Sequence, residues 1–170
     1  MLIFLVGLPG CGKTSLGKKL AQAVKYSFCD LDQWIESGER AGIGELFSKL
    51  GEAEFRLLES RYLSKVKNLD KAIVATGGGT PCFHNHMDLI NAMGISIFLD
   101  VSPQDIAERL SLFGIEKRPI LKGKTPEEIF STLEQLRTVR LPYYARSHIT
   151  LRNPDISFSP DFLRRLEQGS

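Results

Sequence analysis

The chain has 170 residues, of which 42% are apolar and 25% are charged, and its formal net charge is +2. This length and composition are typical of a soluble globular protein, and we expect a single domain over residues 1–170. The small net charge argues against a nucleic-acid-binding or membrane-surface protein, and no stretch has the length of a transmembrane helix. The three cysteines include no C-x-x-C pair, which favours reduced thiols and a cytoplasmic location.

The N-terminal segment predicts a strand, a glycine-rich loop and a helix in succession. Residues 2–6 form a short apolar run typical of a buried strand, and residues 13–24 have the pattern of a helix. Between them, residues 7–14 (GLPGCGKT) fit the phosphate-binding motif G-x-x-x-x-G-K-[ST]. The backbone N–H groups of such a loop, together with the start of the following helix, favour a bound polyphosphate. The sequence therefore predicts a nucleotide-binding loop.

The residues of this loop indicate how a nucleotide is held. The predicted contacts are Gly10, Cys11, Gly12, Lys13, Thr14 and Ser15. We expect Lys13 to reach the β- and γ-phosphates of ATP, and the Thr14 hydroxyl to bind Mg²⁺. Cys11 is either a reactive thiol or a small filler residue in the loop, and the filler role is the preferred interpretation.

Two acidic residues follow the second predicted strand, residues 27–29. Asp30 and Asp32 are two positions apart, which places both carboxylates on one side of an extended segment. One of them can hold Mg²⁺ through water, and the other can orient a substrate hydroxyl and accept its proton. The alternative is a pair of acids at the N-terminus of a helix. The phosphate loop elsewhere in the chain favours the metal and substrate roles.

Residues 44–50 and 52–66 predict two helices, and Arg56 lies in the second. Glu52 and Glu59 are four and three positions from Arg56, so the three side chains lie on neighbouring faces of the helix. They form either an exposed ion-pair network, which contributes little stability, or an arginine that Glu59 holds for bidentate binding of a substrate carboxylate.

The third predicted strand, residues 72–75, runs into Thr76-Gly77-Gly78-Gly79. Successive glycines permit a ligand to approach the backbone closely, although a plain flexible turn has the same composition. Cys82, His84 and His86 come next, and their spacing matches no common zinc motif, so we expect no structural metal there.

The remainder of the chain continues the alternation of helices and strands. Further helices are predicted over residues 85–93, 103–112, 126–140 and 160–168, and further strands over residues 96–100 and 148–151. Residues 113–124 interrupt this pattern with four positive side chains and one negative, and they form either a mobile flap over an anionic ligand or a solvated surface loop. The alternation predicts an α/β fold with a mainly parallel sheet and ligands at the carboxyl ends of its strands.

Two of these helices carry clear start signals, and one carries a candidate binding residue at its end. Ser102-Pro103 and Thr125-Pro126 each place a hydroxyl at the N-cap, a proline in the first turn and an acid three residues after the cap. We therefore expect helices to begin at these prolines. Arg140 is a second candidate for binding a carboxylate.

The phosphate loop and five further motifs together resemble the shikimate kinase family. These motifs are Asp30-Leu31-Asp32, Phe47-x-x-x-Gly51-Glu52-x-x-Phe55-Arg56-x-x-Glu59, Ala75-Thr76-Gly77-Gly78-Gly79, Arg118-Pro119-Ile120-Leu121 and Arg140-Leu141-Pro142-Tyr143-Tyr144. The match runs from Met1 to about Leu151 in the right order and spacing. The chain departs from the family pattern at Thr14-Ser15, Asn85-His86 and Ser147-His148, where the family usually has Ser/Thr-Thr, Asn-Arg and Ala-Asp.

The resemblance implies an ATP-dependent kinase that phosphorylates the 3-hydroxyl of shikimate, on the route to chorismate and aromatic amino acids. It implies a three-layer P-loop fold with a five-stranded parallel sheet of order 2-3-1-4-5 flanked by helices, a shikimate-binding subregion at about residues 32–62 and a mobile lid at about residues 113–124. By position, it implies that Lys13 and Thr14 bind ATP and Mg²⁺, with Asp30 near the metal. It implies that shikimate is bound by Asp32, Arg56, Gly77, Gly78, Gly79 and Arg140. The lid residue Arg118 would contact the ATP phosphates. Lys13, Asp32 and Arg118 are then the catalytic residues.

Two other functions remain open at this point. One is a kinase for another small polyol acid such as gluconate, or for a nucleotide, and the context of Arg56 and the three glycines argues against it. The other is a non-catalytic nucleotide-binding module, which has no need of the Asp30 and Asp32 pair. We expect ATP and shikimate as the partners, no nucleic acid or membrane, and a monomer.

Overall fold

The computed structural model describes residues 1–113, 121 and 123–152. The helix predicted over residues 160–168 lies outside the described residues, as does Arg118 and most of the segment 113–124.

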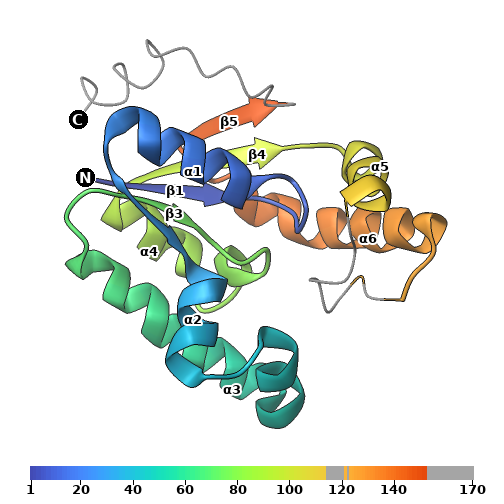
Figure 1. The fold of residues 1–170 in the computed structure, drawn as a ribbon, viewed down its shortest axis with the longest axis horizontal. Helices are drawn as coiled ribbons and strands as arrows, with labels where there is room; N and C mark the ends of the chain where they lie inside the picture. The colour runs from blue at the N-terminus through green and yellow to red at the C-terminus, as the bar shows by residue number, and fades with distance from the viewer. Residues whose placement is uncertain (114–120, 122, 153–170) are drawn as a thin grey trace.

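The described residues contain one parallel sheet (Figure 1). Its strands are β1 (Leu2–Val6), β2 (Ser27–Asp30), β3 (Ala72–Ala75), β4 (Ile95–Asp100) and β5 (Ile149–Arg152). All neighbouring pairs are parallel, and the strand order is β2-β3-β1-β4-β5. The predicted five-stranded sheet and its 2-3-1-4-5 order are therefore confirmed.

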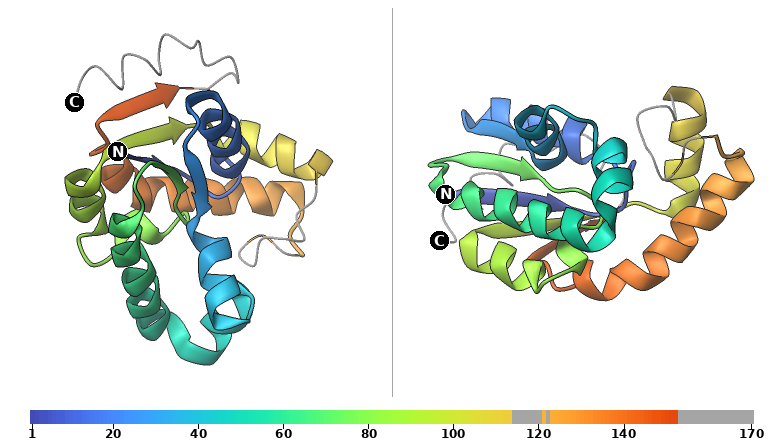
Figure 2. Two further views of the ribbon diagram at one scale, coloured as in Figure 1. Left: turned by 60° about the vertical axis from the view of Figure 1, so that its left-hand side comes forward. Right: turned by 90° about the horizontal axis from the view of Figure 1, so that it is seen from below.

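Helices flank this sheet, with α1 on one face and α4 on the other (Figure 2). The helices are α1 (Lys13–Val24), α2 (Leu31–Glu39), α3 (Ile43–Lys65), α4 (His86–Met93), α5 (Pro103–Phe113) and α6 (Pro126–Tyr144). Two short 3₁₀ turns, η1 (Val66–Asn68) and η2 (Thr80–Cys82), complete the described elements. Helices α2 and α3 pack against each other beyond β2 (Figure 1).

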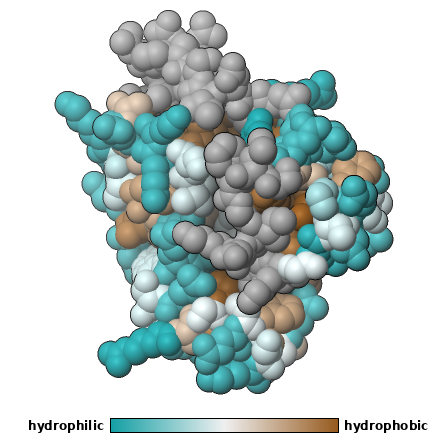
Figure 3. Space-filling view, turned by 45° about the vertical axis from the view of Figure 1, so that its right-hand side comes forward, coloured by the Kyte–Doolittle hydropathy of each residue, from teal (hydrophilic) through white to brown (hydrophobic). Residues whose placement is uncertain are grey.

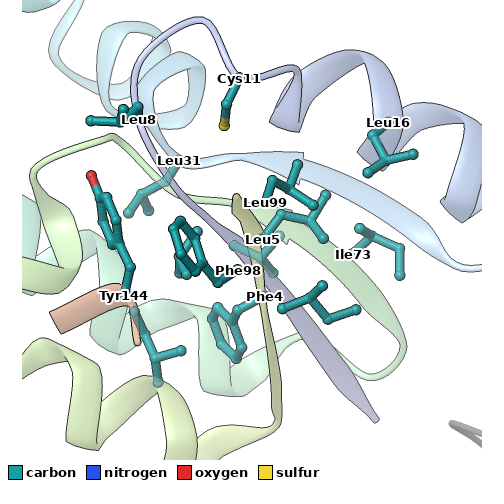
Figure 4. Packing of buried hydrophobic residues seen from close by; sticks show 14 of the residues in the cluster. Phe4, Leu5, Leu8, Cys11, Leu16, Leu31, Ile73, Phe98, Leu99 and Tyr144 are labelled. Atoms are coloured by element: carbon teal, nitrogen blue, oxygen red, sulfur yellow. The ribbon is translucent and has the colours of Figure 1, made fainter. Parts of the chain in front are cut away.

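The hydrophobic core lies around the central strands. Every residue of β1 and β3 is buried, because a parallel strand inside a sheet is covered on both faces. Figure 4 shows Phe4 and Leu5 of β1 packed with Ile73 of β3 and Phe98 of β4, and Tyr144 from the end of α6 lies beside them. This packing anchors α6 to the sheet and so brings Arg140, one turn before Tyr144, toward the carboxyl ends of the strands.

The structure differs from the predicted elements in three places. Helix α2 was not predicted; its Leu31 and Ile35, four positions apart, are both fully buried, and Asp30 caps its N-terminus by accepting from Gln33 N at 3.3 Å. The two helices predicted on either side of Gly51 meet there at a kink with φ 75° and ψ 170°. Helix α6 runs through Pro142 to Tyr144, four residues beyond its predicted end, because burial of Tyr144 outweighs the local cost of the proline.

The part of the surface that Figure 3 draws in colour is largely hydrophilic, with smaller hydrophobic areas between the polar side chains. Within the described residues, no helix combines the length and the hydrophobicity needed to cross a bilayer.

Candidate active site

The loops that carry the phosphate-binding, acidic and glycine motifs follow the carboxyl ends of three adjacent strands. Strand β1 leads into the phosphate loop, β2 ends at Asp30, and β3 leads into the Gly77–Gly79 segment. Because the order is β2-β3-β1, the loop that follows β3 lies between the other two. The predicted position of the site at the carboxyl edge of the sheet follows from this arrangement.

The phosphate loop has the backbone geometry that its glycines predict. Gly7 and Gly12 have φ values of 146° and 100°, which side-chain-bearing residues rarely adopt, and Gly12 caps helix α1. Cys11 is 2% exposed, and Figure 4 shows its sulfur turned from the loop toward the core. Burial of this kind agrees with a packing role for Cys11.

The Lys13 ammonium group is held by the loop itself. Its side chain is 8% exposed, and Nζ donates to the carbonyl oxygens of Gly7 and Leu8 at 2.8 Å each. The Cys11 sulfur, a weak acceptor, lies 3.6 Å from Nζ. Two N–H groups are thus well satisfied, and the third is the one most readily donated to an incoming anion. The positive charge is fixed beside the loop's backbone amides.

Thr14 and Asp30 form the candidate metal site. The Thr14 hydroxyl donates to Asp30 Oδ2 at 2.7 Å, while Asp30 Oδ1 serves as the N-cap of α2. A hydroxyl and a carboxylate oxygen are the hard ligands that Mg²⁺ prefers, so the donor set fits this ion. The helix-cap alternative and the metal role are compatible here, because each uses a different carboxylate oxygen.

Asp32 lies in the first turn of α2, and its carboxyl pKa is raised to about 6. Burial is the main cause, and the nearby carboxylates of Asp30 and Glu59 add to it, whereas Lys13 lowers the pKa. The prediction that Asp30 and Asp32 share one side of an extended segment is wrong, because a helix begins between them. Their carboxylates nevertheless face the same site and interact electrostatically.

The three glycines after β3 allow side chains from three helices to approach one backbone segment. A Cβ at Gly77 would lie 2.7 Å from Asp32 Oδ1, and one at Gly79 would lie 2.8 Å from Arg56 Nη2. A Cβ at Gly78 would lie 3.1 Å from Arg140 Nη1. The segment therefore serves for close approach and is not a plain flexible turn, and it brings the predicted substrate residues of α2, α3 and α6 together.

Arg56 is a buried arginine and not part of an exposed ion-pair network. It is 8% exposed, and its Nη1 donates to Glu59 Oε2 at 3.0 Å, with Glu59 itself 1% exposed. Glu52 is exposed and pairs more loosely with Nη2 at 3.4 Å. Such a buried, partly neutralised guanidinium suits the recognition of a carboxylate.

One residue of the site, Phe83, carries no signal in the sequence. The guanidinium carbon of Arg56 lies 4.1 Å from the centroid of the Phe83 ring, which is the geometry of a cation–π contact. Phe83 also shares a cavity of about 330 Å³ with Arg140. The other lining residues are Cys82, Thr132, Gln135, Leu136, Val139 and Tyr143. Phe83 therefore contacts one of the two arginines and lines a cavity with the other.

This fold and its phosphate loop define a P-loop phosphotransferase, and two buried arginines lie beside its Gly77–Gly79 segment. A family model described as shikimate kinase matches residues 9–160. The chain is 42% identical over 146 residues to a shikimate kinase of Bacteroides fragilis, covering 86% of this chain and 81% of that protein. It is 38% identical over 148 residues to a shikimate kinase of Parabacteroides distasonis, covering 87% and 85%. The chain belongs to the shikimate kinase family.

Solved structures agree with this assignment. The crystal structure of shikimate kinase from Bacteroides thetaiotaomicron superposes with a TM-score of 0.91 at 36% identity, covering 99% of this chain and 98% of that one. Shikimate kinase from Acinetobacter baumannii in complex with shikimate gives a TM-score of 0.83 at 28% identity, covering 98% and 90%.

Proposed function

We propose that this chain transfers the γ-phosphate of ATP to the 3-hydroxyl of shikimate. One observation carries the proposal: the Gly77–Gly79 segment lies close both to the phosphate loop and to two buried arginines. Shikimate is a carboxylated alcohol, so it offers one group for the arginines and one for the phosphoryl donor. The product enters the route to chorismate and aromatic amino acids.

The nucleotide side of the site belongs to the phosphate loop. Backbone N–H groups of residues 10–15 bind the phosphates, and Lys13 neutralises charge that develops on the transferred group. Thr14, with Asp30 acting through water, would hold Mg²⁺, which supplies further charge neutralisation at the phosphates. Arg118 lies outside the described residues; we propose that it contacts the phosphates from a lid formed by about residues 113–124.

The acceptor side belongs to Asp32, the glycine segment and the two arginines. Arg56 and Arg140 bind the substrate carboxylate, and the backbone of Gly77, Gly78 and Gly79 contacts the substrate ring. Asp32 orients the attacking hydroxyl and accepts its proton as the bond to phosphorus forms. A raised carboxyl pKa near 6 makes Asp32 a better proton acceptor than an ordinary aspartate, while it stays ionised at neutral pH.

The alternative functions are not favoured. A non-catalytic nucleotide-binding module has no use for a desolvated carboxylate beside the phosphate loop. The family match to shikimate kinases argues against a gluconate or nucleotide kinase. We further propose a cytoplasmic monomer with one kinase domain, in which residues 32–62 form most of the shikimate-binding region.

A coupled assay of ADP release tests this function. With ATP and Mg²⁺, we expect turnover that depends on shikimate and is absent when gluconate or a nucleoside monophosphate replaces it. Omission of Mg²⁺ is expected to abolish the same signal. Equal turnover with gluconate, or tight ATP binding without any acceptor-dependent turnover, would contradict the proposal.

Asp32→Asn is expected to lower kcat by at least about tenfold and to stabilise the fold at pH 7. The pKa of Asp32 rises from 3.8 to about 6 on folding, so the folded state binds this proton more tightly than the unfolded state. Ionisation of Asp32 therefore lowers the free energy of unfolding as the pH rises between these two values. The loss is at most about 3 kcal/mol, and solvent screening at this partly exposed group reduces it. The asparagine variant lacks this cost.

Thermal unfolding from pH 3.5 to 8 measures the effect, and exposed Asp70→Asn is the control. The Tm difference between wild type and Asp32→Asn should grow from near zero below pH 4 to a plateau above pH 6. The wild-type kcat/KM should fall as the pH drops through about 6, because the proton acceptor is lost. A Tm difference that does not vary with pH would argue against the desolvated carboxylate.

A further inference from the structure

A ring of hydrogen bonds surrounds the base of Arg56. Its first half consists of side chains: Arg56 Nη1 donates to Glu59 Oε2 at 3.0 Å, and Thr80 Oγ1 donates to Glu59 Oε1 at 2.6 Å. Both oxygens of the Glu59 carboxylate are thereby occupied. This half links α3 to the turn that follows the glycine segment.

His86 and Ser60 close the ring. His86 Nδ1 lies 2.8 Å from the carbonyl oxygen of Thr80, and His86 Nε2 lies 2.7 Å from Ser60 Oγ. Ser60 Oγ in turn lies 2.8 Å from the carbonyl oxygen of Arg56. The single hydroxyl hydrogen of Ser60 can be donated to only one of these two acceptors. The ring returns to Arg56 through the turn of α3 that carries both Arg56 and Ser60, and it joins α3, η2 and the first residue of α4.

The chemistry of these partners determines the protonation of the histidine. The carbonyl of Thr80 can only accept, so Nδ1 of His86 carries a hydrogen and donates it. Burial lowers the pKa of His86 and favours the neutral ring, whose Nε2 then accepts from the Ser60 hydroxyl. The charged and titratable groups around the ring are Glu59, Arg56 and His84. Neutral His86 can thus make both contacts at once.

The backbone before His86 is held in an unusual conformation. His84 and Asn85 have φ values of 48° and 56°, a region that residues other than glycine occupy rarely and at a cost. This turn reverses the chain direction, so that the His86 ring reaches the carbonyl oxygen of Thr80, six positions earlier. Glu59, Thr80 and His86 are each at most 2% exposed, so water does not compete for these bonds.

We infer that His86 and Ser60 are positioning residues for the substrate-binding guanidinium of Arg56. The two residues hold the turn of α3 that carries Arg56 against the turn that carries Thr80. Thr80 in turn holds the Glu59 carboxylate, which orients the Arg56 guanidinium. Gly79 belongs to the same turn, and its backbone lies against the Arg56 guanidinium. The ring thus sets the distance between the arginine and the glycine segment on which shikimate rests, and the inference depends on the proposed role of Arg56.

Steady-state kinetics of ring variants test this role. Ser60→Ala and His86→Gln are expected to raise the shikimate KM about tenfold, equivalent to about 1.4 kcal/mol, with the ATP KM changed less than about twofold. Ser60→Thr keeps the hydroxyl and is expected to restore the shikimate KM to within about threefold of wild type. A role in folding alone would lower the Tm and the active fraction without moving the shikimate KM, and that result would overturn the inference.

Matched controls come from the same chain. Ser64 lies one turn after Ser60 on α3, and its hydroxyl donates to the carbonyl of Ser60 at 2.9 Å and contacts no histidine among the hydrogen bonds of the described residues. His148 also pairs with a serine, with Nδ1 3.1 Å from Ser96 Oγ, but His148 is exposed, and the pair joins β4 to the start of β5 away from Arg56. Ser64→Ala and His148→Gln should leave the shikimate KM unchanged, and an equal rise in either control would overturn the inference.

Arg56→Ala, measured in parallel, separates this inference from the proposed function. If Arg56→Ala leaves the shikimate KM unchanged, the role of Arg56 in substrate binding fails. If Arg56→Ala raises the KM and both ring variants do not, the substrate role stands and the positioning role of His86 and Ser60 fails. Should His86→Gln not fold, Ser60→Ala, which removes one oxygen atom, decides the question.

Discussion

Replacement of Lys13 by methionine is expected to lower kcat by at least about a thousandfold. The ammonium group is the one buried positive charge that the phosphate loop itself supplies among the described residues, and two backbone carbonyls hold it beside the phosphate site. Methionine has a similar length but no charge, so the developing charge on the transferred phosphoryl group is no longer neutralised. ADP release in the coupled assay measures the loss.

The Lys13→Met variant is expected to stay folded. The carbonyls of Gly7 and Leu8 lose a donor, which costs about 1–3 kcal/mol, but a buried charge is removed at the same time. The Tm should therefore lie within several degrees of wild type, and the exposed variant Lys18→Met provides the control. Wild-type activity in a folded Lys13→Met protein would remove Lys13 from the mechanism.

Arg56→Ala is expected to raise the shikimate KM by at least about a hundredfold or to abolish measurable activity, while ATP binding changes less than about threefold. The substrate carboxylate loses its buried guanidinium, whereas the phosphate loop, which follows β1 and not α3, is untouched. Shikimate-dependent kinetics and calorimetric titration with an ATP analogue separate the two effects. Loss of ATP affinity with an unchanged shikimate KM would contradict the assignment.

Stability must be controlled in this experiment, because the alanine leaves the Glu59 carboxylate buried without its partner. Breaking a buried pair in this way costs about 3–5 kcal/mol. The double variant Arg56→Met, Glu59→Gln removes both charges and is expected to recover most of the Tm without recovering shikimate binding. Arg61→Ala, an exposed arginine on the same helix, should leave both the KM and the Tm near wild type.

The local features of this protein were predictable from its sequence. The spacing of Gly7, Gly12 and Lys13 identified the phosphate loop, and Thr125 with Glu128 forms the expected capping box at the start of α6. Helix α2 was missed although Asp30 and the Leu31–Ile35 spacing were visible, because the two acids were interpreted as an extended pair. The resemblance to shikimate kinases supplied the strand order, which hydrophobic periodicity alone leaves open.

The sequence by itself determined most of the elements and the phosphate loop, because turn geometry, helix caps and hydrophobic periodicity act between residues a few positions apart. Only the tertiary structure decided that Arg56 is buried, that Phe83 covers it, and that the pKa of Asp32 is raised. These properties arise from groups distant along the chain: Tyr144 bonds to the carbonyl of Gly78, 66 positions away, and His86 bonds to Ser60, 26 positions away. Burial and electrostatic coupling depend on which segments pack together, and no local pattern encodes that packing.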